Sequence, residues 1–241
     1  MVGLLAVCGP ASAQSAPQDK PRSAATLPAT IPIFPLEDAT LFPHAARPLH
    51  IFEPRYRAMI ADALKGDRII GMVTLKPGYE ANYDGRPAIY AIGCAGVLSD
   101  VEELPDGRFN VVLRGIVKFR VNSEDQSRAY RLASVTAMPE ALDDKDKDAL
   151  HKERARLEEL VTRPGSSSSV PADISDDEVV DVLAQYVPIE PIERQGLLEL
   201  DSVLLRARKL IELLESTRKR AGTLPGSPEQ ALASGDPSLK N

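Results

Sequence analysis

The sequence contains no tryptophan, and only 5% of its 241 residues are aromatic. A surface that stacks unpaired nucleic-acid bases needs several exposed aromatic rings, so we expect no such surface here. Cysteine is also scarce, with Cys8 and Cys94 alone in the chain. Two cysteines placed so differently make neither a disulfide framework nor a zinc site. Cys94 lies in an apolar stretch, which is typical of a buried and inert thiol.

Positive charge and long apolar runs are lacking as well. The chain has 35 acidic and 29 basic residues, which gives a net charge of −6. Nucleic-acid-binding proteins normally present a basic face, so we expect no nucleic-acid partner. No stretch approaches the roughly 18 consecutive apolar residues of a membrane-spanning helix, so we expect no membrane insertion.

Signatures of catalysis are missing from the sequence. It contains no Gly-x-x-x-x-Gly-Lys-Ser/Thr loop for nucleotide phosphates and no Gly-x-Ser-x-Gly turn for an activated serine. His44 and His50 are six residues apart, a spacing that does not suit a metal pair on one strand or helix. Neighbouring carboxylates such as Glu102 and Glu103 point apart in a strand, whereas acid–base catalysis needs two that face one gap. We therefore predict no enzyme activity, cofactor or metal site.

Residues 1–30 differ from the rest of the chain in composition. Residues 1–13 are small and mostly apolar, and Ala11-Ser-Ala13 resembles a signal-peptidase site. Two interpretations stay open, an export signal whose start lies upstream of Met1 or a disordered leader. Residues 14–30 are rich in Ala, Pro, Ser and Gln, which is typical of a disordered linker. The sequence therefore leaves the compartment open.

The run from residue 31 to residue 66 predicts a strand, a turn, a second strand and a helix. Ile31 and Ile33 supply a short first strand, and Leu49 and Ile51 alternate with polar neighbours as in a half-buried strand. A proline such as Pro54 is favoured in the first turn of a helix. The apolar stripe of the predicted helix consists of Tyr56, Met59, Ile60, Ala63 and Leu64. Gly66 follows where a left-handed residue commonly ends a helix.

This run resembles the opening of the Lon N-terminal domain family, the substrate-binding domain of ATP-dependent Lon proteases, which also occurs alone in small bacterial proteins and within cereblon. The most specific part of the resemblance is Ile51-Phe-Glu-Pro-Arg-Tyr56. Further matches lie at 93–96, 104–108 and 113–115, and the resemblance extends over about residues 31–216. The motif residues that carry it are Phe34, Pro35, Leu36, Pro43, Phe52, Glu53, Pro54, Arg55, Tyr56, Gly107 and Gly115.

Short strands dominate residues 68–138. Apolar runs separated by turn signals predict strands at 68–75, 88–104, 109–113, 116–121 and 130–138. Gly93 and Gly96 inside a strand suggest a bulge or a close backbone approach. Pro105-Asp-Gly107 predicts a tight turn. The regular spacing favours a closed or nearly closed antiparallel sheet, and the resemblance likewise implies a barrel-like β-subdomain.

The pattern then becomes helical. Residues 143–163 read as a charged, exposed helix, and Ser175 with Glu178 reads as a capping box that opens the next helix. Asp201 is expected to cap a final long helix. We therefore predict an α+β fold with a leader at 1–30, a β-subdomain with one helix at 31–140, a helical subdomain at 141–218 and a disordered tail at 219–241.

The resemblance implies substrate binding and no proteolysis, because the ATPase and serine–lysine peptidase parts of Lon proteases are missing from this chain. One hypothesis is a module that holds unfolded or peptide segments, for delivery to a separate protease. The alternative is an adaptor or regulatory domain with one specific partner. A binder of unfolded segments needs exposed apolar groups or an open sheet edge. Phe42, Tyr79 and Tyr83 are the aromatic residues that we expect in loops, and so they are the candidate substrate contacts. The structural interpretation of the charged pair Glu53 and Arg55 is that Glu53 caps the helix and that Arg55 or Arg57 pairs with a carboxylate of the sheet.

Overall fold

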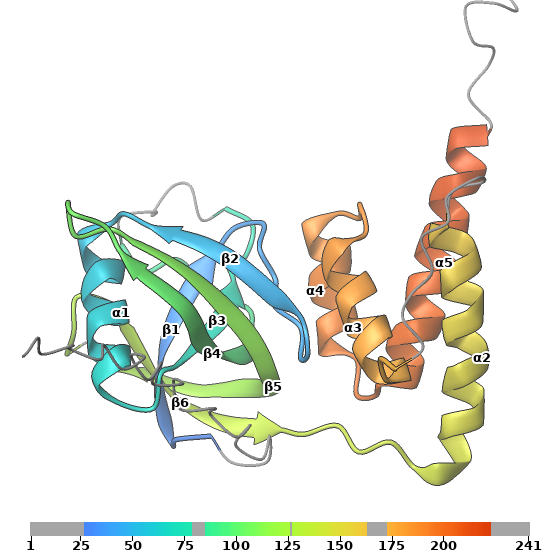
Figure 1. The fold of residues 1–241 in the computed structure, drawn as a ribbon, viewed down its shortest axis with the longest axis horizontal. Coiled ribbons are helices and arrows are strands. Elements are labelled where there is room, and N and C mark those ends of the chain that lie inside the picture. The colour runs from blue at the N-terminus through green and yellow to red at the C-terminus, as the bar shows by residue number, and fades with distance from the viewer. Residues whose placement is uncertain (1–26, 79–84, 126, 163–172, 223–241) are drawn as a thin grey trace, which may run out of the picture.

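The computed structural model describes residues 27–78, 85–125, 127–162 and 173–222, and Figure 1 shows a β-sheet part with α1 against it and the other helices beside it. The strands are β1 (Thr30–Leu36), β2 (Ala46–Ile51), β3 (Ile69–Thr74), β4 (Ile92–Glu103), β5 (Phe109–Asp125) and β6 (Arg131–Met138). The helices are α1 (Pro54–Lys65), α2 (Asp144–Val161), α3 (Asp176–Tyr186), α4 (Pro191–Glu199) and α5 (Val203–Gly222). The α+β fold predicted from the sequence is confirmed.

The strands form one sheet that closes into a barrel. The order is β2-β5-β4-β3-β1-β6, and β6 also pairs with β5, so five strands form a ring with β2 attached to β5. All pairs are antiparallel except β1 with β3, which are parallel. The expectation of a wholly antiparallel sheet is therefore wrong at this pair. Parallel neighbours need a crossover, and here β2 and α1 provide it.

The inside of the barrel is filled by aliphatic side chains around the ring of Phe119, which is fully buried. Glycine makes room for this ring. A Cβ atom added at Gly93 would lie 2.4 Å from the Met72 carbonyl oxygen and 2.9 Å from Phe119 Cζ. The close backbone approach predicted at this glycine is confirmed, and the pairing register shifts between Ala95 and Gly96 as in a β-bulge.

Helix α1 lies at the end of the barrel farther from the other helices (Figure 1). Its apolar stripe is buried at Tyr56, Met59, Ile60 and Ala63, and the Tyr56 ring packs 4.5 Å from the ring of Phe34. The predicted helix stop is wrong in detail. Gly66 has a φ of −116°, while the left-handed residue is Arg68, with a φ of 59°.

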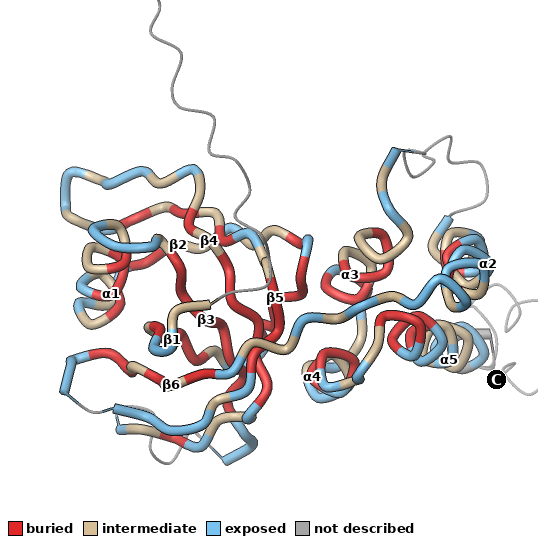
Figure 2. The backbone as a smooth tube through the Cα atoms, turned by 90° about the horizontal axis from the view of Figure 1, so that it is seen from below, coloured by how far each residue is buried: buried red, intermediate tan, exposed pale blue. Residues whose placement is uncertain are grey.

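The helical part continues the core of the barrel. One apolar cluster runs from α1 and the outer side of the sheet into α2, α3, α4 and α5. Figure 2 shows buried residues on α3 and α4 where these helices approach β5. Helices α2 and α5 lie side by side and are joined by ion pairs, Arg156 with Glu215 at 3.0 Å and Arg208 with Glu153 at 3.0 Å.

The predicted start of α3 after Ser175 is confirmed, but the capping box predicted there and the cap predicted at Asp201 are wrong. Ser175 precedes α3, but its side chain makes no capping hydrogen bond. Helix α5 is capped by Ser202 and not by Asp201, because the Leu205 N–H donates to Ser202 Oγ at 3.3 Å. Asp201 and Ser202 both offer a short polar side chain beside the start of α5, so residue type alone does not predict which of the two caps the helix. Of the predicted leader at 1–30 and tail at 219–241, residues 1–26 and 223–241 lie outside the described residues, whereas β1 already begins at Thr30 and α5 continues to Gly222.

Candidate functional site: the open edge of strand β2

Strand β2 is the only described strand of the sheet with a single neighbouring strand, since it pairs with β5 from Ala46–Arg114 to Ile51–Phe109. Its first residue is covered. The Ala46 carbonyl oxygen accepts hydrogen bonds from Gln185 Nε2 at 2.8 Å and from the Tyr186 hydroxyl, both on α3. The strand runs from this covered end beside α3 toward α1 (Figure 1).

The backbone of β2 presents hydrogen-bonding groups on the side away from β5. The Ala46 carbonyl points to that side, because it bonds to α3. In an antiparallel pair, alternate residues direct their backbone groups to the same side, so those of Pro48 and His50 also face away from β5. Pro48 supplies only a carbonyl, whereas His50 supplies both an N–H and a carbonyl. The edge therefore offers backbone hydrogen bonds to a short added strand, whereas Pro48 and the covered Ala46 interrupt a longer one.

Apolar surface lies next to this edge. Phe52, which directly follows the strand, is 60% exposed, and its ring stacks on His50 with centroids 6.3 Å apart. An open groove of about 370 Å³ crosses the outer face of β2 and β5, with Pro48, Leu49 and Val112 among its lining residues. We call Pro48–Phe52 and this groove the edge surface.

The residues after Phe52 hold the end of the strand in place. Glu53 stands at the N-terminal cap position of α1 without a side-chain capping bond. Its carboxylate instead accepts from Arg55 Nε at 2.9 Å, and the Arg55 guanidinium lies 4.7 Å from the centre of the Tyr56 ring. The specific sequence motif therefore anchors α1 on the barrel and leaves Phe52 in solvent.

The predicted contact residue Phe42 is corrected by the structure. Phe42 is fully buried between the barrel and the helices, where its backbone N–H donates to Gln185 Oε1 at 3.1 Å. Phe42 packs so closely against Gly115 that no side chain fits there, since a Cβ atom at residue 115 would lie 1.9 Å from the Phe42 carbonyl oxygen. Tyr79 and Tyr83 lie outside the described residues, and their contact role stays a proposal.

Phe52 could have been found from the sequence. Leu49 and Ile51 alternate toward the core, so the same period directs His50 and Phe52 outward. Phe42, by contrast, lies outside the described strands, between β1 and β2, where no periodicity applies. Phe42, which was predicted to lie in a loop, is thus a core residue. Phe52, which belongs to the sequence motif, is a surface residue.

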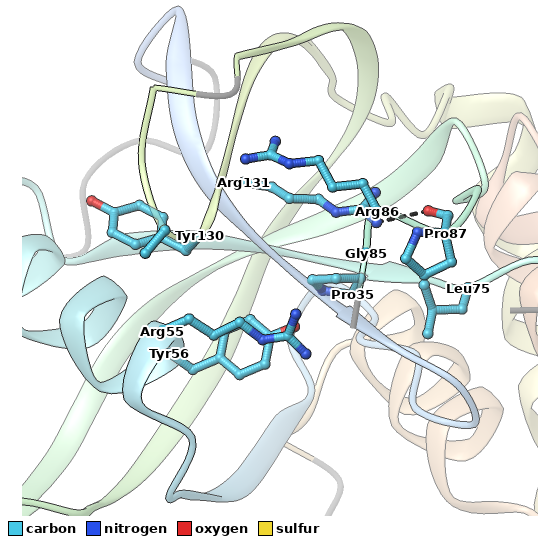
Figure 3. A pocket seen from close by; sticks show the side chains of 10 residues that line it. Pro35, Arg55, Tyr56, Leu75, Gly85, Arg86, Pro87, Tyr130 and Arg131 are labelled. Carbon is cyan, nitrogen blue, oxygen red and sulfur yellow. Dashed lines mark hydrogen bonds between the residues drawn. The ribbon is translucent and has the colours of Figure 1, made fainter. Parts of the chain in front are cut away.

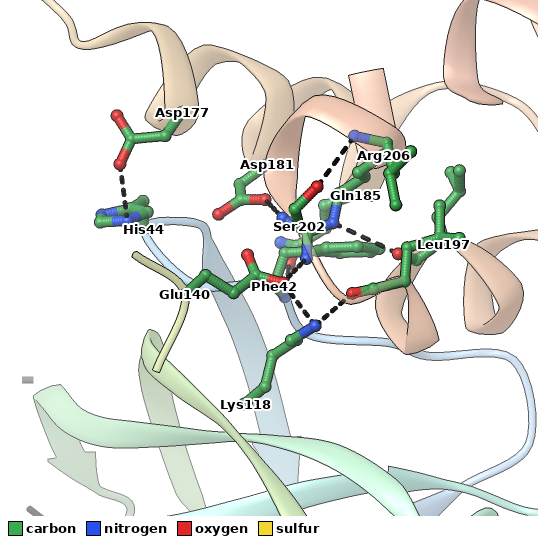
Figure 4. Close-up of polar contacts among 12 residues, drawn as sticks. Phe42, His44, Lys118, Glu140, Asp177, Asp181, Gln185, Leu197, Ser202 and Arg206 are labelled. Atoms are coloured by element: carbon green, nitrogen blue, oxygen red, sulfur yellow. Dashed lines mark hydrogen bonds and ion pairs between the residues drawn. The ribbon is translucent and has the colours of Figure 1, made fainter. Parts of the chain in front are cut away.

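A buried ionic cluster joins the barrel to the helices (Figure 4). Lys118 of β5 pairs with Glu140, which also accepts from Arg206 Nη2 of α5 at 2.7 Å. Arg206 Nη1 lies 2.5 Å from Asp181 Oδ1 of α3, and burial raises the pKa of Asp181 to about 7 against the attraction of this guanidinium. Two cationic and two carboxyl side chains from the barrel and the helices meet here, so the cluster joins these two parts of the structure.

The histidines do not come together. His44 Nε2 lies 3.5 Å from Asp177 Oδ2, whereas His50 Nδ1 lies 2.8 Å from Asn110 Oδ1 on the strand surface. Among the described residues, no three His, Cys, Asp or Glu side chains are grouped as a metal site would require. Cys94 is fully buried, as predicted, and burial raises the pKa of its thiol.

Within the described part of the chain, no helix combines the length and the apolar character that crossing a bilayer requires.

The comparisons with known proteins agree with this fold. Residues 30–216 match the family model described as the ATP-dependent protease La (LON) substrate-binding domain. The chain therefore belongs to this family. It is 26% identical over 201 residues to the Lon protease of Anaeromyxobacter dehalogenans and 26% identical over 201 residues to Lon protease 2 of Myxococcus xanthus. Each match covers 80% of this chain and 24% of the relative, so the chain spans about a quarter of their length.

Solved structures share the fold. The N-terminal domain of the Mycobacterium avium complex Lon protease superposes with a TM-score of 0.62 at 18% identity, covering 77% of this chain and 98% of that one. A Lon N-terminal domain protein from Xanthomonas campestris gives a TM-score of 0.54 at 23% identity, covering 76% of this chain and 97% of that one.

Proposed function

We propose that this chain is a non-catalytic substrate-binding module that holds unfolded or peptide segments of other proteins. The observation that carries the proposal is the edge surface. An exposed aromatic side chain and an open strand edge occur together there, and an extended polypeptide offers a match to both.

The geometry favours short and unspecific recognition. Backbone hydrogen bonds at Pro48 and His50 do not depend on the sequence of the bound segment. The exposed Phe52 ring can contact any apolar side chain that the segment places next to it. Such contacts bury a small area, and weak transient complexes are typical of small areas. A module of this kind suits capture and release, and delivery of the captured segment to a separate protease is part of the proposal.

The test is a titration of the full chain against a fluorescent, permanently unfolded protein, followed by anisotropy. We expect saturable binding in the micromolar range that unrelated unlabelled unfolded proteins compete away. Phe52→Ser is expected to weaken binding by about tenfold or more, since a buried aromatic contact contributes roughly 1.5–3 kcal/mol. Ile192→Ser is the matched control, because Ile192 is 56% exposed on α4 and is not part of the edge surface.

Flat anisotropy, or equal losses in both variants, would contradict the edge surface as the binding site. Flat anisotropy together with capture of a single folded partner would instead support the adaptor hypothesis.

A further inference from the structure

A second cavity lies at the end of the barrel beside α1. Its volume is about 270 Å³, and its lining includes three arginines from separate parts of the chain, namely Arg55 of α1, Arg86 and Arg131 of β6. Figure 3 shows Arg86 and Arg131 on one side of Pro35 and Arg55 on the other. We call this cavity the arginine pocket.

Within the part of the chain that the structure describes, the lining of the arginine pocket carries positive charge and no carboxylate. Arg55 pairs with Glu53 at 2.9 Å and Arg131 with Glu124 at 3.2 Å, and neither carboxylate lines the cavity. Arg86 bonds to the backbone carbonyls of Asp125 and Arg128, both at 3.3 Å. Among the described residues no carboxylate lies within ion-pair distance of Arg86, so an anionic ligand would compensate its charge.

These guanidinium groups are already positioned. Arg131 is 6% exposed, and its Nη2 donates to the Pro87 carbonyl oxygen at 2.7 Å. The two bonds of Arg86 to the turn between β5 and β6 hold its side chain over the cavity. Side chains fixed in this way lose little further entropy when an anion binds. The planar fork of arginine matches the two oxygens of a carboxylate.

Apolar side chains form part of the remaining lining. Pro35, Leu75 and Pro87 contribute surface beside the guanidinium groups. The volume lies just below the roughly 300–1,000 Å³ of pockets for drug-sized ligands, so the occupant is small. A carboxylate with an apolar side chain on the adjacent carbon fits both kinds of lining. The C-terminal residue of a polypeptide carries a carboxylate with a side chain on the adjacent carbon. It is attached to the rest of the polypeptide on one side only, so it can enter a small pocket.

We propose that the arginine pocket binds the α-carboxylate of a polypeptide's C-terminal residue, with the apolar side chain of that residue against Pro35, Leu75 and Pro87. The assignment deepens the proposed function and rests on it. Phe52 and Arg55 are three residues apart, so their Cα atoms are separated by at most about 11 Å. The edge surface and the arginine pocket therefore lie within reach of one short segment.

The test compares two fluorescent ten-residue peptides that end in leucine, one with a free C-terminal acid and one with a C-terminal amide. We expect the full chain to bind the acid at least tenfold more tightly, because charge-assisted hydrogen bonds are lost in the amide. Arg86→Gln is expected to remove this preference. Arg208→Gln, at an exposed ion pair on α5, is the control and is expected to keep it.

Folding of each variant is checked by its circular dichroism spectrum and thermal midpoint. A second variant, Arg55→Gln, guards against a loss that stems from altered folding around residue 86. Equal binding of acid and amide by the unaltered chain would overturn the pocket assignment. An amidated peptide with an internal glutamate that binds as tightly as the free acid would also overturn it, since any carboxylate would then suffice.

The two proposals fail separately. If the unfolded protein binds through Phe52 while acid and amide peptides bind equally, the pocket assignment is wrong and the proposed function stands. If the free acid binds in an Arg86-dependent manner while internal unfolded segments do not bind, generic capture is wrong and the pocket assignment stands. If no polypeptide binds at all, both are wrong.

Discussion

At the scale of single residues, Gly93 shows how tightly the barrel is packed. Gly93→Ala is expected to cost about 1–3 kcal/mol, because its Cβ would collide with the Met72 carbonyl oxygen. Gly196→Ala on the exposed face of α4 is the control. No atom lies within 4 Å of the added Cβ there, so helix propensity predicts a gain of about 0.5–1 kcal/mol. Urea unfolding of both variants measures the difference, and equal stabilities would contradict the packing argument.

Cys94 is expected to be unreactive toward thiol reagents in the folded protein. The thiol is fully buried and its pKa is raised by burial, so little thiolate forms and no reagent reaches it. The measurement is maleimide labelling of a Cys8→Ser variant followed by mass spectrometry. We expect no label under native conditions and one label in denaturant. Rapid native labelling would mean that the helices separate readily from the barrel.

The sequence predicted residue roles well where periodicity applied. The apolar stripe of α1 was predicted from its spacing. The outward direction of Phe52 follows from the period of the strand before it, but it was not predicted. Phe42 could not be assigned, since its burial depends on Gln185, which is 143 positions away. Local patterns carry no information about such a partner.

At the scale of elements, the ionic cluster ties β5 to α3 and α5. Arg206→Met is expected to destabilise the protein by about 3–5 kcal/mol, because it leaves Asp181 and Glu140 buried with one cation fewer. Arg208→Met on the same helix breaks an exposed pair and is expected to cost less than about 1 kcal/mol. Chemical unfolding compares the two, and a cost below 1 kcal/mol at Arg206 would contradict the role of the cluster.

Asp181 is expected to make the free energy of unfolding depend on pH. Its pKa is about 7 in the folded chain and about 3.9 when unfolded, so the folded state binds more protons between these values. The contribution of Asp181 is present below about pH 4 and is lost as the pH rises through 7. The destabilisation by Asp181→Asn is therefore expected to be larger at pH 5 than at pH 8. A gap that is constant or grows with pH would contradict the raised pKa.

Strand and helix identities followed from the sequence more readily than their pairing did. The parallel pairing of β1 with β3 was missed, because the sequence of each strand reads the same in either direction of pairing. The strands predicted separately at 109–113 and 116–121 are one 17-residue strand, β5, with a register shift between them. Pairing is decided by the packing of α1 and the barrel core, which act at long range.

At the scale of the whole molecule, barrel and helices share one apolar core and one ionic joint. The change of period near residue 140 predicted two parts, but not how firmly they are joined. The edge surface lies on the barrel, with its start covered by α3. The helices thus limit where an added strand can lie, and the open part of β2 extends from Pro48 to Ile51, directly before Phe52.

The most direct test of substrate capture at this edge is hydrogen exchange of the full chain with and without an excess of permanently unfolded protein. The account predicts slower exchange in peptides that span residues 46–52, because the His50 N–H gains a backbone partner. Peptides that span Ile192 and Leu205, both exposed on the helices, are expected to keep their rates. Protection confined to α4 and α5, with residues 46–52 unchanged at saturation, would contradict the central claim.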